Sequence, residues 1–197
     1  MSNNPNPSPF MAPAPVVPPI PPKLPLPYAI ATLAPNLYQA TFDVSRLTPS
    51  ADEFASVYLW LSTLTEKDTV KFNFIETGLK GIAPFEDHIA LLNCIMLCSA
   101  KTIAVLDKMY LGLECYFIMA CKAVEITDFA LLGVPSVYPA EAERLTEKDE
   151  AVVMAGNQLI ANAVEHLKIL TQEEAITLVQ RQTVFVQADE LKSRITQ

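Results

Sequence analysis

Short strand patterns alternate with amphipathic helix patterns along most of this chain, and no other feature restricts its fold as strongly. Alternating apolar and polar residues predict strands, and apolar residues three or four positions apart predict the helices between them. The expected strands cover residues 37–44, 70–75, 101–106, 124–127, 130–134 and 183–186. The expected helices cover residues 50–64, 84–98, 110–122, 141–167 and 188–194, with a short helix that begins at Thr171. Repeated alternation of this kind predicts an α/β fold in which crossover helices join parallel strands.

Two of the expected helices begin with the spacing of a capping box, in which a side-chain oxygen and a residue three positions later satisfy exposed backbone N–H groups. Ser50 precedes Glu53 at this spacing, and Thr171 precedes Glu174. The long helix begins instead in the charged stretch 141–148, and its apolar positions continue to Leu167.

Prolines divide the chain into two parts. Twelve of the 16 prolines fall within residues 1–35. Proline lacks a backbone donor and favours extended conformations, so we expect residues 1–27 to form a flexible arm and residues 28–197 to form the folded domain. Such an arm could bind an aromatic groove of a partner, or it could be a spacer or lie on a neighbouring subunit. We favour the second interpretation.

The composition indicates association between copies. Hydrophobic residues make up 51% of the sequence and charged residues 18%, whereas charged residues are about a quarter of an average globular sequence. A single large core in a monomer would also explain these values, but we favour a homo-oligomer, because apolar surface is then buried against other subunits. The net charge of −8 argues against direct binding of nucleic acid.

The cysteines predict a reducing compartment. All four lie in apolar segments: Cys94, Cys98, Cys115 and Cys121. Cys94 and Cys98 are one helical turn apart, but no histidine or carboxylate at a short spacing completes a metal site, so we expect buried, reduced thiols and no cofactor. The N-terminus lacks the pattern of a secretory signal, and polar residues interrupt the apolar segment 89–106. We therefore expect a cytoplasmic protein that does not span a membrane.

Three stretches carry a family resemblance. Residues 54–75 combine a long helix, an acidic loop that ends in Lys-Asp, and a strand. Residues 84–121 combine a helix, the strand residues Thr102–Val105 (TIAV), and a segment with Gly112 near the start of a helix. Residues 183–194 (TVFVQADELKSR) combine a short strand and an acidic helix. In this order the stretches resemble the proteolytic subunit of the Clp protease and, through it, the wider crotonase superfamily. The resemblance spans residues 37–194, and it implies repeated β-α units with a handle-like long helix at Val152–Leu167.

The resemblance also implies a Ser-His-Asp site, yet none of the three residue types stands at the matching positions. Tyr110 takes the place of the serine, Pro135 that of the histidine and Val179 that of the aspartate. A phenol on a bulky ring does not replace a serine hydroxyl, and the sequence has only two histidines, His88 and His166. We therefore predict that the chain is not an enzyme.

The loop that would form the oxyanion hole has changed as well. Two of its glycines, Gly78 and Gly81, are separated in sequence, and the charge of Glu76 would disfavour an oxyanion nearby.

The second side of this degenerate cleft would hold Asp107, Lys108, Tyr110 and Gly112. Asp107 and Lys108, with Glu114, could form a solvated ion pair or a remodelled binding pocket, and we favour the ion pair. Cys115, with His166, is the alternative nucleophile for a diverged hydrolase, although we expect Cys115 to be a buried, inert thiol.

These observations predict a catalytically inactive pseudo-protease that assembles with itself, as rings where it follows the Clp family. Its other partners could be an active protease or, if a phage encodes the chain, a phage or host protein. The alternatives are a diverged hydrolase or crotonase-type enzyme, and a module that binds a peptide or ligand in the old cleft.

Overall fold

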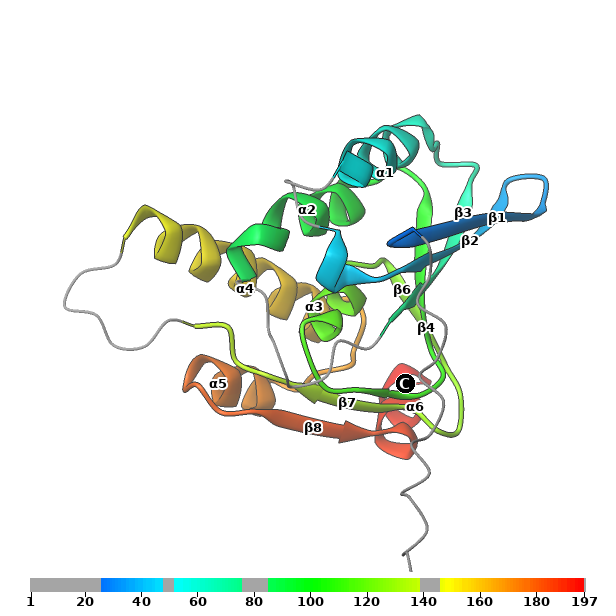
Figure 1. Ribbon diagram of the computed structural model, residues 1–197. Coiled ribbons are helices and arrows are strands. Elements are labelled where there is room, and N and C mark those ends of the chain that lie inside the picture. Colours follow the sequence, from blue (N-terminus) through cyan, green and yellow to red (C-terminus); the bar gives the residue numbers. More distant parts are fainter. Residues whose placement is uncertain (1–25, 48–51, 76–84, 139–145, 197) are drawn as a thin grey trace, which may run out of the picture.

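The computed structural model describes residues 26–47, 52–75, 85–138 and 146–196, which form two β-sheets with helices on and between them (Figure 1). The larger sheet has five strands in the order β1 (Tyr28–Ala34), β2 (Leu37–Phe42), β3 (Thr69–Phe74), β4 (Lys101–Leu106) and β6 (Ala123–Ile126). The smaller sheet has three strands in the order β5 (Met109–Tyr110), β7 (Leu131–Val134) and β8 (Val184–Gln187).

The larger sheet confirms the predicted α/β arrangement. β2, β3, β4 and β6 run parallel, and helices connect them. β3 shows why the alternation was informative, because Val70, Phe72 and Phe74 are buried while the residues between them are half-buried. The Phe72 and Phe74 rings stack with centroids 5.6 Å apart, and Phe74 also meets Phe117 at 5.6 Å. These aromatic contacts join the sheet to the helix packed beneath it.

Two helices lie over one side of the larger sheet (Figure 1). They are α1 (Asp52–Thr63) and α2 (Ile89–Leu97), and the 3-10 helix η2 (Phe85–His88) leads directly into α2. A second 3-10 helix, η1 (Val44–Arg46), follows β2. The Trp60 ring of α1 meets the Tyr38 ring of β2 edge-on at 6.2 Å, which anchors α1 to the sheet.

The helix α3 (Glu114–Met119) lies between the two sheets (Figure 1). It contacts β3 of the larger sheet and β7 of the smaller one. All six of its residues are buried, so no side of this helix faces solvent.

The long helix α4 (Glu147–Glu165) packs against α3. It begins with a capping box formed by Thr146 and Asp149. Near its end, the Asn162 side chain donates hydrogen bonds to the carbonyl oxygens of Met119 (2.5 Å) and Cys121 (3.0 Å). The predicted long helix is thus confirmed, whereas its role as a handle between subunits stays a prediction.

The C-terminal part supplies α5 (Gln172–Val179), β8 and α6 (Ala188–Ile195). The predicted capping box of Thr171 and Glu174 is present at the start of α5. The Ser50–Glu53 pair cannot be compared in this way, since Ser50 lies outside the described residues, as do residues 1–25 of the arm expected at residues 1–27.

Two features differ from the sequence-based expectations. β1 was not expected, and it pairs antiparallel with β2 through a turn in which Asn36 has a φ of 60°. The helix expected from Tyr110 begins only at Glu114, because Met109 and Tyr110 instead form β5, parallel to β7. Tyr110 and Cys115 therefore do not share a helix.

Within the described ranges, none of the helices combines the length and the apolar character required to cross a membrane.

Candidate functional site

A cavity of about 230 Å³ lies where η2, the start of α3, the segment after β7 and the first turns of α4 meet. Its walls are formed by Phe85, Glu86, Leu113, Pro135, Ser136, Val137, Tyr138, Asp149 and Val152. The cavity includes Pro135, the position that the sequence analysis predicts to correspond to a catalytic histidine. We therefore take this cavity as the candidate site and refer to it as the cleft.

Two tyrosines hold the segment after β7 in place at the cleft. The Tyr116 hydroxyl donates a hydrogen bond to the carbonyl oxygen of Pro135 (2.8 Å), and the Tyr116 ring meets the Phe85 ring at 5.1 Å. The Tyr138 hydroxyl donates to the Asn157 side chain of α4 (2.8 Å). Burial raises the pKa of both phenols, so they stay protonated near neutral pH and act as hydrogen-bond donors.

The structure brings two of the three expected triad positions near each other. The Ser136 hydroxyl donates to the carbonyl oxygen of Leu178 (2.8 Å), which joins the residue after Pro135 to the residue before Val179. Tyr110 does not line the cleft. Its hydroxyl lies 2.9 Å from both the carbonyl oxygen of Val105 and the Asp107 carboxylate. Burial, followed by the hydrogen bond to Asp107, raises the pKa of this phenol.

Cys115 is a buried, structural thiol. Its sulfur lies 3.4 Å from the carbonyl oxygen of Tyr110 and 3.7 Å from that of Gly133, and its side chain is fully enclosed. Burial, and then the charge of Glu114, raise the pKa of this thiol well above its ordinary value. The thiolate required of a nucleophile is therefore scarce at neutral pH.

The prediction that Asp107, Lys108 and Glu114 form a solvated ion pair is wrong for Glu114. Asp107 is exposed, but Glu114 is completely buried, and its carboxylate accepts a hydrogen bond from the backbone N–H of Leu111 (2.9 Å). The ammonium group of Lys108 lies 5.6 Å from the centre of the Tyr110 ring. Since α3 is enclosed by the two sheets, its first residue cannot reach solvent.

Neither histidine lines the cleft. His88 is completely buried, and neither of its ring nitrogens has a hydrogen-bond partner among the described residues. His166 is exposed at the C-terminal end of α4. The expected approach of His166 to the buried Cys115 is therefore not observed.

The comparisons with known proteins identify the fold. No protein-family model and no curated protein matches the sequence. The structure is similar to an enoyl-CoA hydratase from Bacillus anthracis, with a TM-score of 0.58, 13% identity, and coverage of 86% of this chain and 67% of that chain. A monofunctional enoyl-CoA isomerase from M. smegmatis gives a TM-score of 0.54 at 14% identity, over 86% of this chain and 74% of that chain. An enoyl-CoA hydratase from Mycobacterium avium subsp. paratuberculosis gives 0.54 at 16% identity, over 88% and 71%.

The chain has a crotonase-like α/β fold. This confirms the fold class that the wider of the two resemblances implied. The Clp-like relationship and the loss of a triad stay predictions, because structural similarity at this level of identity extends to the fold alone.

Two carboxylates that line the cleft were not predicted from the sequence. Glu86 comes from η2 and Asp149 from the first turn of α4, 63 positions away (149 − 86). The hydrogen bonds from the Thr146 side chain and backbone lower the pKa of Asp149, so its carboxylate stays ionised. The spacing of Thr146 and Asp149 marks a helix start in the sequence, but nothing in the sequence places Glu86 at the same cleft.

None of the remaining expected site residues is among the described residues that line the cleft. Glu76, Gly78 and Gly81 lie outside the described residues. Gly112 is buried just before α3, next to the cleft residue Leu113. No group of three or more potential metal ligands occurs in the described part of the chain.

Proposed function

We propose that this chain is a non-catalytic crotonase-fold protein that associates with further copies of itself and serves as a scaffold. The observation that carries the proposal is the environment of Cys115. This thiol is completely buried, and backbone carbonyl oxygens surround its sulfur. A hydrolase built on Cys115 would require a thiolate that a substrate can reach, and this environment opposes both requirements.

The other polar groups near the cleft support the same conclusion. The hydroxyl hydrogens of Tyr116, Ser136 and Tyr138 are each directed to a protein acceptor. These bonds fix the segment after β7 and leave the hydroxyl groups committed to the fold. In this proposal, Tyr110, Pro135 and Val179 are the remains of a lost triad, and the Clp-like ancestry is part of it.

The smaller sheet supplies the surface proposed for association. β8 is an edge strand in the described part of the chain, and its residues alternate between buried and exposed. Phe185 is 61% exposed on its outer face, and Met109 and Phe129 are also exposed. A second copy could pair its own β8 antiparallel to this edge about a twofold axis, which satisfies the free backbone groups and covers Phe185.

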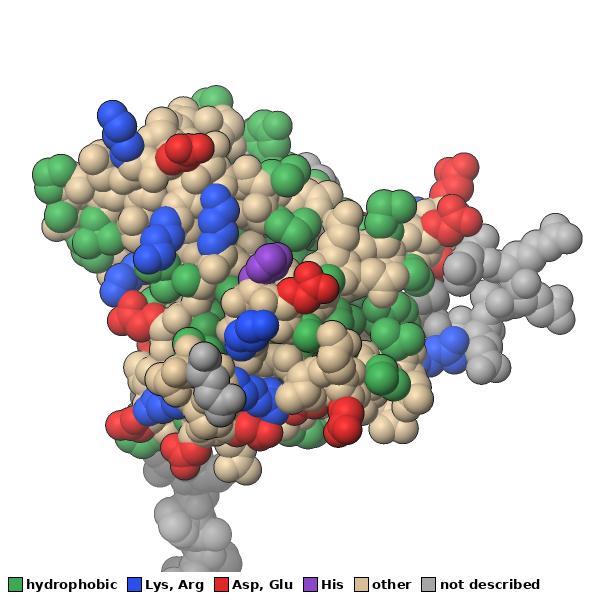
Figure 2. All heavy atoms as spheres, turned by 180° about the vertical axis from the view of Figure 1, so that it is seen from behind, with side chains coloured by type: hydrophobic (Ala, Val, Ile, Leu, Met, Phe, Trp, Pro, Cys, Tyr) green, Lys and Arg blue, Asp and Glu red, His purple; other side chains and the backbone are tan. Residues whose placement is uncertain are grey.

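The rest of the surface is compatible with a scaffold. Figure 2 shows exposed apolar side chains at several places on one face of the molecule, with charged groups of both signs between them. The proposal also includes partners other than a second copy, such as an active protease or a phage or host protein.

A second candidate function is acyl-CoA hydration or isomerisation, the activities named for the structural neighbours. The presence of Glu86 and Asp149 in the lining of one cleft favours it, because two carboxylates at one site can act as general acid and base. The cavity of about 230 Å³ is smaller than most small-molecule sites, which measure roughly 300–1,000 Å³. The cavity volume argues for the scaffold as the first candidate.

Light scattering at micromolar concentration tests the proposed association. We expect a mass that is a multiple of 21.7 kDa for the unmodified chain and a smaller mass for Phe185→Glu. Leu59→Glu, at a similarly exposed position on α1, is the matched control and should keep the mass of the unmodified chain. A monomeric mass for the unmodified chain would contradict self-association.

A hydration assay with a short 2-enoyl-CoA separates the two candidates. The scaffold proposal requires no turnover above background. Turnover that is lost in Glu86→Gln would overturn it and establish the second candidate function.

A further inference from the structure

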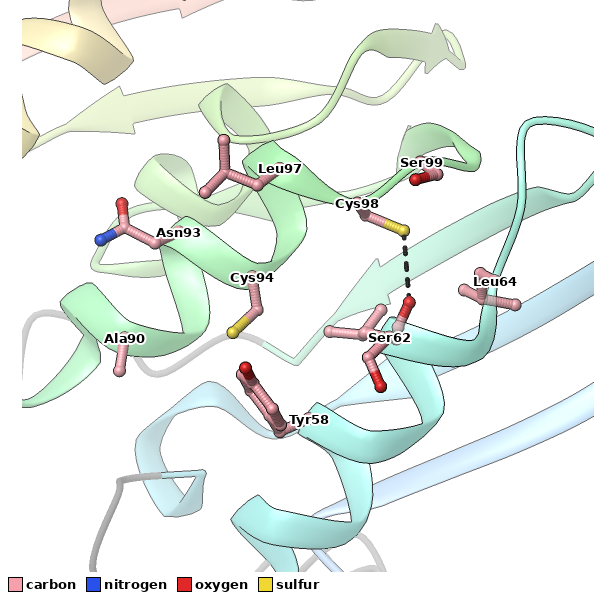
Figure 3. Close-up of a pocket in the computed structure, with 10 residues that line it drawn as sticks. Tyr58, Ser62, Leu64, Ala90, Asn93, Cys94, Leu97, Cys98 and Ser99 are labelled. Carbon is pink, nitrogen blue, oxygen red and sulfur yellow. Dashed lines mark hydrogen bonds between the residues drawn. The ribbon is translucent and has the colours of Figure 1, made fainter.

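A second and larger cavity, of about 410 Å³, lies between α1 and α2, away from the cleft (Figure 3). Tyr58 of α1 and Cys94 of α2 point toward one another across it. None of its lining residues is charged, and its polar groups are small hydroxyl, thiol and amide groups. We call this cavity the α1–α2 groove.

The groove has an aromatic and apolar rim. The Tyr58 ring stacks on the Phe54 ring one helical turn earlier, with centroids 6.5 Å apart and planes 25° apart. Tyr58 and Leu97 are large side chains that remain exposed, and Leu97 is 79% exposed. A stacked aromatic pair, with Tyr58 exposed and Phe54 half-buried, beside an uncharged groove is the kind of surface that accepts proline rings of an extended segment.

We propose that the α1–α2 groove binds the proline-rich segment of the same chain, residues 5–25. This segment contains ten of the 16 prolines, and Lys23 is its one charged residue. Segment and groove therefore match in chemistry, since neither requires a charged partner. Proline rings would pack on Tyr58 and Phe54, and residues such as Ile20 and Leu24 would fill the apolar part of the groove.

The segment is long enough to reach the groove from its attachment point. It joins the fold just before β1, which is part of the same sheet that α1 covers. An extended proline-rich segment spans about 3.1 Å per residue, so residues 5–25 could extend roughly 60 Å. A domain of this size has a radius of gyration of about 15 Å.

Attachment to the same chain also makes a weak contact sufficient. A tethered segment has an effective concentration in the millimolar range, on the order of the dissociation constant of a short proline-rich contact. The groove would then be covered without a separate partner. This inference is independent of the proposed association through β8, because it concerns the opposite, helix-covered sheet.

Cys94 gives a direct readout of groove occupancy. It is half-buried in the groove, whereas Cys98, Cys115 and Cys121 are buried. Burial raises the pKa of the Cys94 thiol, so alkylation by iodoacetamide is best followed near pH 9. The rate for Cys94 is measured by peptide mass spectrometry, and Cys94→Ser shows whether the signal has been assigned correctly.

The key comparison is between the unmodified full chain and a full-length variant in which the ten prolines of residues 5–25 are replaced by serine. We expect Cys94 to react about half as fast in the unmodified chain, because an effective concentration near the dissociation constant keeps the groove covered about half of the time. A synthetic peptide of residues 5–25, added at millimolar concentration, should restore protection in the variant. Equal rates in the two chains would overturn the proposal.

Changes in the groove give a second test. Leu97→Glu places a charge in the groove and should prevent the proline-rich segment from binding. When both chains carry Leu97→Glu, the proline-to-serine chain and the proline-containing chain should therefore alkylate Cys94 at about the same rate. Met154→Glu on α4 is the matched exposed control and should leave the ratio of the two rates unchanged. Protection that increases with protein concentration would place the segment on a second copy and would overturn binding within the same chain. Light scattering on the same variants separates this result from association through β8.

Discussion

The ring of His88 packs edge-on against the ring of Phe117, with centroids 5.9 Å apart and planes 80° apart. His88 is completely buried, and neither ring nitrogen has a partner among the described residues. Desolvation lowers the pKa of His88 from its ordinary value of 6.5, although Asp87 opposes the change. His88 is therefore neutral in the folded protein and costs stability, since a buried polar group without a partner loses its hydration.

The first prediction concerns the pH dependence of stability. Below about pH 6.5 the unfolded chain binds a proton at this histidine that the folded chain does not bind, so the free energy of unfolding should fall as the pH is lowered from 7 to 5. The maximum slope is about 1.4 kcal/mol per pH unit for one proton. His88→Leu should remove this slope and raise the free energy of unfolding at pH 7 by about 1 kcal/mol.

Urea titrations at pH 5, 6 and 7 measure this effect. Most carboxylates titrate below this range, which isolates the histidine contribution. His166→Gln is the control, because His166 is exposed, and the slope should remain. If the slope of the His88→Leu variant equals that of the unmodified chain, the origin assigned to it is wrong.

The second prediction concerns the buried carboxylate at the start of α3. Glu114 accepts the hydrogen bond of the Leu111 N–H, and no side of α3 reaches solvent. Glu114→Ala should lower the free energy of unfolding by about 2–3 kcal/mol, since it leaves a buried donor without a partner and creates a cavity. Glu114→Gln keeps an acceptor oxygen and should cost less than half as much. Equal losses for the two variants, measured from urea midpoints, would show that this hydrogen bond contributes nothing.

The third prediction compares two glycines. A Cβ atom at Gly133 would lie 2.6 Å from a Leu111 methyl group and 2.8 Å from the Phe185 ring, so Gly133→Ala should cost about 1–3 kcal/mol. Combining it with Phe185→Leu should recover part of the loss, because the ring that the new methyl group meets is removed.

Gly156 provides the matched control. It lies in α4, and a Cβ atom there would be no closer than 3.5 Å to Val137. Alanine has a higher helix propensity than glycine, by about 0.5–1 kcal/mol. Gly156→Ala should therefore raise the free energy of unfolding by about this amount, and the melting temperature with it. A loss at Gly156 as large as that at Gly133 would contradict the packing argument.

The sequence was sufficient for most of the fold because its periodicity reflects one-sided burial. β3 alternates because one face meets α3, and the face of α4 that packs on α3 and η2 carries its apolar positions. Periodicity fails where burial is uniform. Tyr110 and every residue of α3 are buried, so nothing in the apolar run separates β5 from the helix start at Glu114. It also fails for β1, which is largely exposed at a sheet edge.

The candidate site was less predictable than the fold. Pro135 lines the cleft, but its expected correspondence to a catalytic histidine stays a prediction, and Glu86 and Asp149 line the same cleft only through the tertiary packing of η2 and α4. A single sequence carries no local signal for such long-range contacts. Glu114 was misjudged for the same reason, since its charge is typical of a surface position and its burial depends on both sheets.

The fourth prediction concerns Glu174, which interacts both with a residue close to it in the sequence and with a distant one. Its capping role at Thr171 was visible in the sequence, whereas its ion pair with Arg194 of α6 was not. Two nitrogens of Arg194 donate to the two carboxylate oxygens of Glu174 at 2.8 and 2.9 Å, and one also donates to the carbonyl oxygen of Ile169 at 2.9 Å. Burial alone would raise the pKa of Glu174, but the hydrogen bonds from Arg194 and Thr171 outweigh it and lower the pKa.

This pair should hold α6 against α5. Arg194→Lys keeps the charge but loses the two-pronged geometry, so it should cost about 1 kcal/mol, and Arg194→Ala about 2 kcal/mol. Because the pKa of Glu174 is lowered in the folded state, the stabilisation is present above its ordinary pKa of 4.5 and is lost as the pH falls below that value. The difference in unfolding free energy between the unmodified chain and Arg194→Ala should therefore shrink between pH 6 and pH 3. A difference that stays constant over this range would mean that Arg194 stabilises α6 by packing and by its bond to Ile169, and not through the carboxylate of Glu174.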